Sequence, residues 1–468
     1  MSWLNVCGVR ENKVPYSFFS YKDKCYLCEY NWCEMKRMFF LCDASRLELS
    51  LRMYRLVKSF LKLIYNKEKK RRKVCLVFVF FTLCFLNLPM LFGATHGDSL
   101  EVGLMTCEPG SEVYSLYGHT AIRIKNYTTG EDWVFNYGTF SFRQPYFVWR
   151  FVRGECDYQI GAIPFMYFAS EYRERGSSVY QQTINMMPDE KRRLFAYLLE
   201  NMRPENREYR YNFLYDNCTT RARDVIENVI EGNVIYRASD SVRTYRRILH
   251  EYTSANYPWT ELGNDICLGA GADVDIDERQ EMFAPFYLLR YADAAVIRDS
   301  VGNERPFVLS KYEVVKKNEV PKASSLLPHP SHLVWLLVVV VITLTLVEYR
   351  RHLCFWWLDA IVMTLAGIIG VVVTFLFFFS VHPTVATNWQ IWVFNPLPLL
   401  AMPWVVWCAI KGKKTKYHAF NALVLIFFIL FSPIIPQDFC VLVVPLALVL
   451  CCRSCSYIVR YKKETSRC

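Results

Sequence analysis

The sequence predicts an α+β domain outside the cytoplasm, followed by an all-α membrane domain of five helices. Two observations support this fold class. Long apolar runs are confined to residues 74–92 and 333–452, and the region between them has the mixed composition of a globular domain. Within that region, the period-two alternation of strands is interspersed with the apolar spacing of amphipathic helices. A chain of 468 residues is long enough for two or three domains.

The formal net charge of +11 is concentrated beside the apolar runs. The basic clusters are Lys67–Lys73, Lys411–Lys416 and Arg453–Arg467. Basic residues next to membrane segments set the orientation of a membrane protein, whereas nucleic-acid binding would need them on a soluble domain. We therefore expect a membrane-embedded chain with no nucleic-acid partner.

The N-terminal region divides into a segment without pattern and an export signal. Residues 1–52 match nothing downstream, and we expect them to be a non-functional or mis-assigned extension. Met53 is an alternative start, because residues 53–94 then hold a basic n-region followed by an apolar stretch at 74–92. This segment is either a cleaved signal peptide or a retained signal anchor. Either one sends residues 95–320 out of the cytoplasm.

The exported domain is expected to contain a β-hairpin. Alternation over Ala121–Lys125 and Trp133–Phe140, with a turn at 126–130 between them, predicts two strands that carry His119 and Asn136. The other elements expected in this domain are strands at 147–156, 158–163 and 179–185, helices at 165–175, from Pro188, at 219–230 and at 281–289, an exposed turn region at 263–271 and a strand pair at 305–315.

Five apolar segments follow a linker at 321–332, and their lengths suit a bilayer. They are roughly 333–347, 355–381, 391–410, 418–435 and 439–452, all within the membrane domain 333–452. The connectors after the first and third segments are basic, and so is the tail 453–468, whereas the other two connectors hold no Lys or Arg. The positive-inside rule then puts the soluble domain outside and the C-terminus in the cytoplasm.

The second connector carries polar residues at or just inside the outer face of the membrane. These are His382 and Asn388, and Asn395 follows near the start of the next apolar segment at a similar depth. Polar side chains at membrane depth are costly and often functional. The alternative is a re-entrant loop that its own hydrogen bonds stabilise, and both interpretations stay open.

Cys218 lies close to a predicted helix N-terminus. Asp216 and Asn217, which precede it, are N-cap residue types. Unpaired N–H groups and the helix dipole favour a thiolate there, and cysteine nucleophiles are commonly built in this way. The alternative is a buried core thiol. His119, upstream, is the strongest candidate for the base that a nucleophile needs.

The sequence gives no sign of a metal or cofactor. In the soluble domain we find no His, Cys and acidic cluster with metal-ligand spacing and no phosphate-binding loop, so we expect neither group. If that domain is exported, Cys107, Cys156 and Cys267 could supply a disulfide, and which pair forms one, if any, stays open.

Four motifs resemble the Lnb family of bacterial lipoprotein N-acyltransferases: Gly118–Arg123, Asn136–Phe140, Glu205–Arg207 and Tyr215–Arg221. The resemblance covers about residues 97–452, and the stretch with His382, Asn388 and Asn395 is similar to the family's membrane-domain signature. More distantly, a His on a strand before a Cys at a helix start resembles circularly permuted papain-like enzymes of the NlpC/P60 and lecithin–retinol-acyltransferase types. The resemblance therefore implies a papain-like α+β periplasmic domain followed by five transmembrane helices.

The family resemblance also implies a reaction. An inner-membrane enzyme would move an acyl chain from a membrane phospholipid, through a thioester on Cys218, to the α-amino group of a diacylglyceryl-cysteine lipoprotein. His119 would be the base, and Asn136 would hold its imidazole. The residues expected to line or support the site are Tyr117, Tyr137, Asn217 and Arg221.

Two alternatives to acyl transfer stay open. The first is a membrane-anchored NlpC/P60-like amidase or peptidase that acts on cell-wall peptide with the same Cys218 and His119. The second is a binding module without catalysis. The oligomeric state is not predicted.

Overall fold

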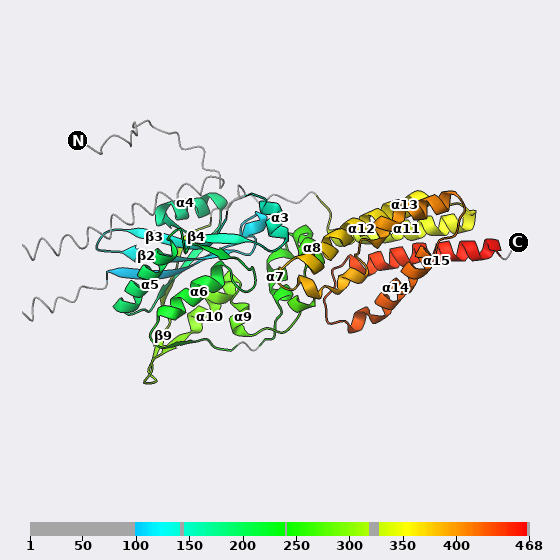
Figure 1. The fold of residues 1–468 in the computed structure, drawn as a ribbon. Helices are drawn as coiled ribbons and strands as arrows, with labels where there is room; N and C mark the ends of the chain where they lie inside the picture. The colour runs from blue at the N-terminus through cyan, green and yellow to red at the C-terminus, as the bar shows by residue number, and fades with distance from the viewer. Residues whose placement is uncertain (1–98, 141–144, 239–240, 318–326, 466–468) are drawn as a thin grey trace, which may run out of the picture.

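The computed structural model describes residues 99–140, 145–238, 241–317 and 327–465. The described chain has two parts arranged end to end (Figure 1): a sheet domain, residues 99–317, and a helical domain, residues 327–465. The predictions for residues 1–52 and 53–94 lie outside the described residues.

A seven-stranded antiparallel sheet forms the centre of the sheet domain. In spatial order its strands are β10 (Val308–Val315), β5 (Val179–Ile184), β1 (Leu100–Cys107), β2 (His119–Asn126), β3 (Asp132–Thr139), β4 (Asp157–Pro164) and β6 (Glu208–Arg210). A second sheet holds the short strands β7 (Asn233–Ile235), β8 (Val296–Arg298) and β9 (Glu304–Pro306). The predicted hairpin is confirmed as β2 and β3, near the middle of the large sheet. We had predicted no strand at β1 or β6.

Helices cover both faces of the large sheet. One face is covered by α4 (Phe165–Arg175), and the other by α5 (Pro188–Asn201), α6 (Cys218–Val229) and α10 (Pro285–Ala294). On β2, Ile122 and Ile124 pack in the core on the α6 side, whereas Ala121 packs in the core on the α4 side. This alternation follows from the period of two in a strand. The remaining helices of this domain are α3 (Phe147–Val152), α7 (Tyr245–Thr253), α8 (Pro258–Cys267) and α9 (Glu278–Glu281).

The strand predicted at 147–156 is wrong, because this segment begins with the helix α3. Its Val- and Phe-rich composition favours a strand in isolation. In the structure, Trp149 packs against Phe375 of the helical domain, with ring centroids 5.2 Å apart. Tertiary contacts across the domain boundary thus override the local preference.

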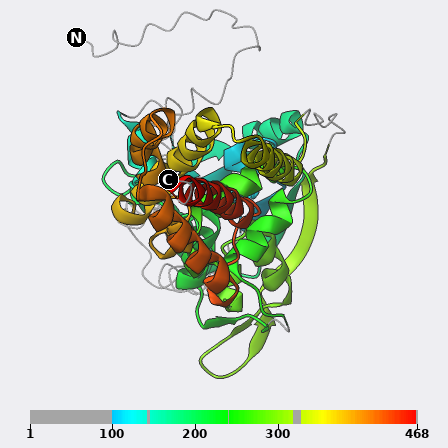
Figure 2. The ribbon, with the colours of Figure 1, turned by 90° about the vertical axis from the view of Figure 1, so that its right-hand side faces the viewer.

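The helical domain holds five α-helices among its described residues. They are α11 (Pro330–Arg351), α12 (Trp356–Phe379), α13 (Leu397–Ile410), α14 (Tyr417–Phe431) and α15 (Val443–Thr465). By length and composition, the described residues hold four helical segments able to cross a membrane: Pro330–Arg351, Trp356–Phe379, Trp389–Ile410 and Tyr417–Ile434. The apolar part of α15, Val443–Val459, is shorter. Figure 2 shows α15 in the middle of the bundle, where it packs against α11, α12 and α14.

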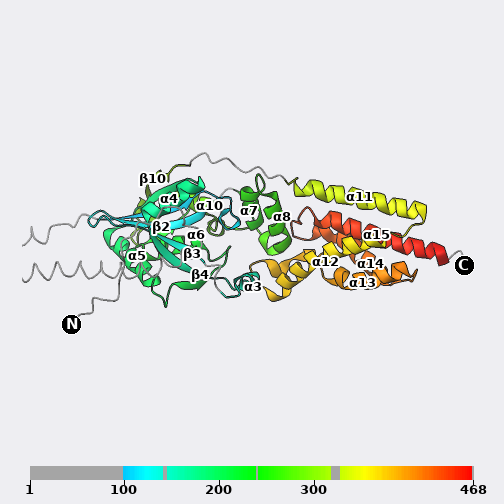
Figure 3. The ribbon, with the colours of Figure 1, turned by 90° about the horizontal axis from the view of Figure 1, so that it is seen from above.

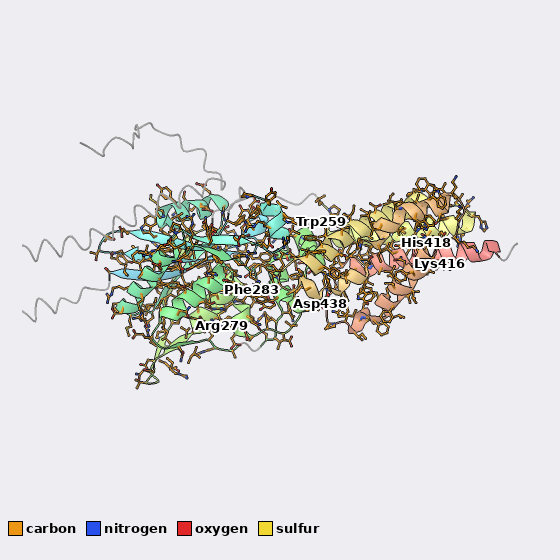
Figure 4. The ribbon with its side chains drawn as sticks, in the orientation of Figure 1. Trp259, Arg279, Phe283, Lys416, His418 and Asp438 are labelled. Carbon is orange, nitrogen blue, oxygen red and sulfur yellow. The ribbon has the colours of Figure 1, made fainter. Side chains whose placement is uncertain are left out.

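Both connectors of the helical domain that hold no Lys or Arg face the sheet domain. Trp259 and Asp438, labelled in Figure 4, lie at the junction, whereas Lys416 and His418 lie toward the far end of the bundle. The basic connectors are therefore gathered at the end away from the sheet domain, as Figure 3 also shows for the α11–α12 connection.

The prediction of an exposed turn region at 263–271 is also wrong. It comprises the end of α8 and most of the short helix η3 (Ala270–Ala272), and Leu268 within it is buried. The Asn388 side chain donates to the carbonyl oxygens of Ile266 (2.8 Å) and Cys267 (3.3 Å). The Gln390 side-chain amide donates to the backbone carbonyl oxygen of Asp265 (2.6 Å). Gly269 and Gly271 of this segment permit close packing between the domains.

Candidate active site

Cys218 is the first residue of α6, and Asn217 is the N-cap. The Asn217 side-chain oxygen accepts from the N–H groups of Thr219 (2.8 Å) and Thr220 (3.0 Å). Its amide nitrogen donates to the carbonyl oxygens of Phe213 and Phe283, at 2.9 Å each. Because both ends of this amide are occupied within the protein, Asn217 supports the helix start and the thiol position.

His119 and Asn136 lie on the same face of the β2–β3 hairpin. The register pairs Arg123 with Val134, and residues two apart on a strand share a face. His119 Nε2 lies 3.1 Å from Asn136 Oδ1. An amide oxygen can only accept, so Nε2 carries the proton and Nδ1 is the ring nitrogen left for another partner.

The thiol of Cys218 is hydrogen-bonded to the His119 side chain. Burial alone would raise the pKa of Cys218, but the charge of His119 and this hydrogen bond lower it. Hydrogen bonds with the Thr120 backbone and the Thr219 hydroxyl act in the same direction. The pKa of Cys218 therefore lies below its ordinary value, which favours the thiolate.

A glycine bulge in β3 shapes the space beside the thiol. The β3–β4 register shifts between Asn136 and Thr139, and Gly138 between them has φ +85°. A Cβ atom on Gly138 would lie 3.5 Å from the Cys218 Cβ and 3.4 Å from the Tyr211 ring. Glycine thus allows both the left-handed backbone and the approach of Cys218 and Tyr211 to the strand.

Tyr137 and Arg221 contact residues around the site and not the thiol itself. Tyr137 is buried, burial raises its pKa, and its hydroxyl accepts from the Asn201 amide (3.1 Å). Arg221 makes two hydrogen bonds to Asp216, at 2.6 and 2.7 Å, and lies 3.6 Å from the Tyr209 ring centroid. These contacts hold the loop before α6 against the sheet.

Tyr117 lies just before His119 on the chain but points toward α8. Its hydroxyl accepts from the Asn264 amide (2.5 Å), and its ring meets that of Tyr252 edge to face. Burial raises the pKa of Tyr117 to about 12. It therefore links the strand that carries His119 to the helix that contacts the helical domain.

Two of the three polar residues singled out near the outer face, His382 and Asn388, lie at the domain junction. Asn388 bonds across the junction to α8, whereas Asn395 has a local partner and accepts from the N–H of Leu397, the first residue of α13 (3.1 Å). His382 Nε2 donates to the Phe151 carbonyl oxygen (2.6 Å). Burial lowers the pKa of His382, and its ring also contacts Phe213, in the loop before Cys218. Of the three residues, His382 is thus the one joined to that loop.

Cys107, Cys156 and Cys267 are free thiols in the structure, so the disulfide left open above is not formed. Cys107 is opposite His119 in the β1–β2 register, and burial raises its pKa. Of these cysteines and Cys218, only Cys218 has a lowered pKa.

One group of described residues has metal-ligand geometry: His250, Glu261 and Asp265, whose ligand-type atoms lie within 4.8 Å of one another. Asp265 already bonds to Arg246 (2.8 Å) and to His250 (2.9 Å). Glu261 accepts from the Thr253 hydroxyl (2.9 Å). The guanidinium beside Asp265 disfavours binding of a cation, so we infer that these three residues hold α7 and α8 together.

Sequence patterns did not reveal the stack of rings that begins beside the thiol at Tyr211. Tyr211 stacks on Tyr158 with centroids 4.3 Å apart, and Tyr158 stacks on Phe140 at 4.9 Å. These residues come from three separate segments, so no spacing in the sequence groups them. The density of aromatic residues, 16% of the chain, was the one available signal.

Two family profiles match the chain. The Lnb N-terminal periplasmic domain matches residues 90–252, and the Lnb transmembrane domain matches residues 322–464. The first match contains His119, Asn136 and Cys218, and the second contains α11 to α14 and all but the last residue of α15. Searches of curated proteins and of solved structures gave no match.

Proposed function

The chain belongs to the Lnb family, and from this premise we propose that it is a lipoprotein N-acyltransferase. It takes an acyl chain from a membrane phospholipid and transfers it to the α-amino group of a diacylglyceryl-cysteine lipoprotein. The observation that carries the proposal is the contact of Cys218 with His119, which is itself bonded to Asn136, in a domain joined to apolar helices. Both substrates are lipids of the membrane, which accounts for the helical domain.

The first half-reaction loads the enzyme. The Cys218 thiolate attacks the ester carbonyl carbon, and the C–O bond to the glycerol then breaks. The leaving lysophospholipid oxygen takes the proton that His119 holds, so a thioester and a neutral alcohol result. The Cys218 N–H, in the first turn of α6 where backbone donors have no intrahelical partner, is suited to stabilise the oxyanion.

The second half-reaction transfers the acyl group from Cys218 to the lipoprotein. The lipoprotein α-amino group attacks the thioester carbonyl carbon, and His119 accepts the proton that the nitrogen loses. The C–S bond breaks, which returns the thiolate and leaves an amide on the lipoprotein. Asn136 keeps Nε2 of His119 occupied throughout, so Nδ1 is the atom that moves protons.

The other expected residues take supporting roles in this proposal. Asn217 positions the thiol, and Tyr137 and Arg221 hold the loop before α6. The contacts between the sheet domain and the helical domain depend on Tyr117, His382 and Asn388. Asn395 orders the start of α13. The reaction proposed needs no metal or cofactor.

The proposed arrangement in the cell follows from the charged connectors. The sheet domain is periplasmic, the protein lies in the bacterial inner membrane with α15 as its fifth span, and the C-terminus is cytoplasmic. The central packing of α15 supports its membrane role despite its shorter apolar part. The order of His119 before Cys218 supports a permuted papain-like domain over about residues 95–320. We propose in addition that residues 53–94 export it and that residues 1–52 are dispensable.

Mass spectrometry of one lipoprotein N-terminus tests the function. Cells with the full chain should N-acylate the lipoprotein, whereas cells with the Cys218→Ala or His119→Ala variant should not. Purified protein given labelled phospholipid should gain a hydroxylamine-sensitive label on Cys218. Free fatty acid or cut cell-wall peptides without N-acylated lipoprotein would instead identify a hydrolase. Full activity of Cys218→Ala would identify a different mechanism.

A further inference from the structure

An exposed apolar surface lies where the sheet domain meets the helical domain. We call it the α3 patch, and it consists of Val148, Trp149, Phe151, Phe378, Phe379 and Val381. Val148 is 72% exposed and Phe379 is 63% exposed. Soluble surfaces rarely hold so many large apolar side chains together, so this surface has an apolar environment in the working protein.

The α3 patch is continuous with the surface of a membrane helix. Its two halves are joined by the Trp149–Phe375 contact and by the Val381 N–H, which donates to the Arg153 carbonyl oxygen (2.9 Å). Figures 1 and 3 show α3 beside the end of α12 at the junction. Because α12 ends at Phe379, α3 lies at the level where this apolar span leaves the bilayer.

The opposite side of α3 is tied to the sheet domain by charges. Arg150 forms an ion pair with Asp157 of β4, and Arg210 lies 2.9 Å from the same carboxylate. A short helix with apolar residues and a Trp on one side and a fixed cation on the other is typical of an element that lies in a membrane interface.

A row of aromatic rings connects the α3 patch to the thiol. Consecutive ring centroids lie between 4.3 and 6.1 Å apart. In order from the patch, the rings are Phe151, Phe147, Phe140, Tyr158 and Tyr211. The last ring lies next to Gly138, which also adjoins Cys218. We call these five residues the aromatic row.

We propose that α3 lies in the outer leaflet of the membrane and that the aromatic row guides the acyl chain of a donor phospholipid from the bilayer to Cys218. This inference rests on the proposed acyl transfer and names how the lipid reaches the site. The phenylalanine rings from Phe151 to Phe140 keep the chain in contact with apolar surface, and the buried Tyr158 lies behind them while the ester carbonyl approaches the thiolate. The lipid then leaves the bilayer only in part.

The first test locates α3. The full chain is reconstituted in liposomes of phosphatidylethanolamine and phosphatidylglycerol, with and without brominated phospholipid, and its tryptophan fluorescence is measured. The Trp149→Phe variant should lose a quenchable share of the emission. Trp133, buried in the core of the sheet domain, is the control, because Trp133→Phe should remove only emission that bromine does not quench. Absence of quenching at Trp149 overturns the inference.

The second test separates the path from the chemistry. Loading of Cys218 is measured from labelled phospholipid in the liposomes and from water-soluble p-nitrophenyl acetate, which acylates a thiolate and releases nitrophenolate. Phe151→Ser should slow loading from phospholipid by about tenfold and leave loading from the soluble ester unchanged. Val301→Ser, at an apolar residue in the β8–β9 loop that is more exposed than Phe151 (85% against 46%), is the control and should change neither rate.

The outcomes distinguish the two proposals. If Phe151→Ser loads from phospholipid as fast as the unmodified chain, the path is wrong while acyl transfer stands. If the unmodified chain reacts with p-nitrophenyl acetate but gains no label from phospholipid, the proposed function itself fails.

Discussion

The backbone of Gly269 lies so close to that of Asn388 that a Cβ atom on Gly269 would stand 2.5 Å from the Asn388 nitrogen. The same atom would also lie 2.5 Å from the Thr384 carbonyl oxygen. Gly269 has φ −96°, which any residue adopts, so only the contact between the domains requires a glycine here.

Gly269→Ala should therefore push the sheet domain away from the second connector of the helical domain. Overpacking of this kind costs about 1–3 kcal/mol of stability. We expect a lower unfolding midpoint in detergent and a lower rate of Cys218 loading from phospholipid, because the site no longer sits correctly on the membrane.

Gly263 supplies the matched control. It lies in α8, only six residues away, and a Cβ atom there would meet nothing within 4 Å. Gly263→Ala should keep full activity and gain about 0.5–1 kcal/mol from its better helix propensity. Equal unfolding midpoints and equal loading rates for the two variants would mean that the close contact at Gly269 does not set the position of the two domains relative to each other.

The thiol of Cys218 should ionise at lower pH than an ordinary cysteine. His119 lowers its pKa against the opposing effect of burial. In His119→Ala the burial is opposed only by the hydrogen bonds with the Thr120 backbone and the Thr219 hydroxyl, so the pKa should rise and the thiolate fraction at neutral pH should fall. Alkylation of Cys218 by iodoacetamide, measured against pH, should then slow by about tenfold or more at pH 7.

Peptide mass spectrometry keeps that measurement specific to one thiol. Cys107 is the internal reference, since burial raises its pKa and it should stay unreactive in both proteins. An unchanged pH profile in His119→Ala would show that the imidazole does not set the state of the thiol.

Arg453 joins three helices at the end of the bundle far from the sheet domain. Its guanidinium bonds to Asp359 of α12 at 2.7 and 2.8 Å, and also to Glu348 and Thr345 of α11. Arg453→Met leaves two buried carboxylates without their cation and should cost about 3–5 kcal/mol. Arg350→Met, at an exposed position on α11, should change the stability by no more than about 0.5 kcal/mol. Both stabilities are compared through the thermal unfolding midpoint in detergent. A similar midpoint for both variants would contradict the role of Arg453.

Local patterns were enough to predict the elements that carry the thiol and the imidazole. Alternation with a short turn at 126–130 predicted the β2–β3 hairpin, and N-cap residues before helical spacing predicted α6. The side that Asn136 faces needed the register, because a shift by one residue would turn it away from His119.

The elements at the junction were not predictable in this way. α3 has the composition of a strand, and the segment 263–271 has the glycines of an exposed turn. Their conformations depend on Phe375 and Asn388, which lie more than a hundred residues further along the chain. No local pattern contains such contacts, and the aromatic row is hidden for the same reason.

Gly138 should be needed for acyl loading beyond its effect on stability. With φ +85°, Gly138→Ala strains the backbone by about 1 kcal/mol. Its methyl group would also occupy the space between Cys218 and the Tyr211 ring, where the acyl group is proposed to pass. Gly130, in the hairpin turn, has φ +76°, and a Cβ atom there would meet nothing within 4 Å. Both alanine variants should lose similar stability, but only Gly138→Ala should load Cys218 more slowly, by about tenfold. If Gly130→Ala loses as much activity, the loss reflects backbone strain alone. If Gly138→Ala loads normally, the acyl group does not use the space beside Tyr211.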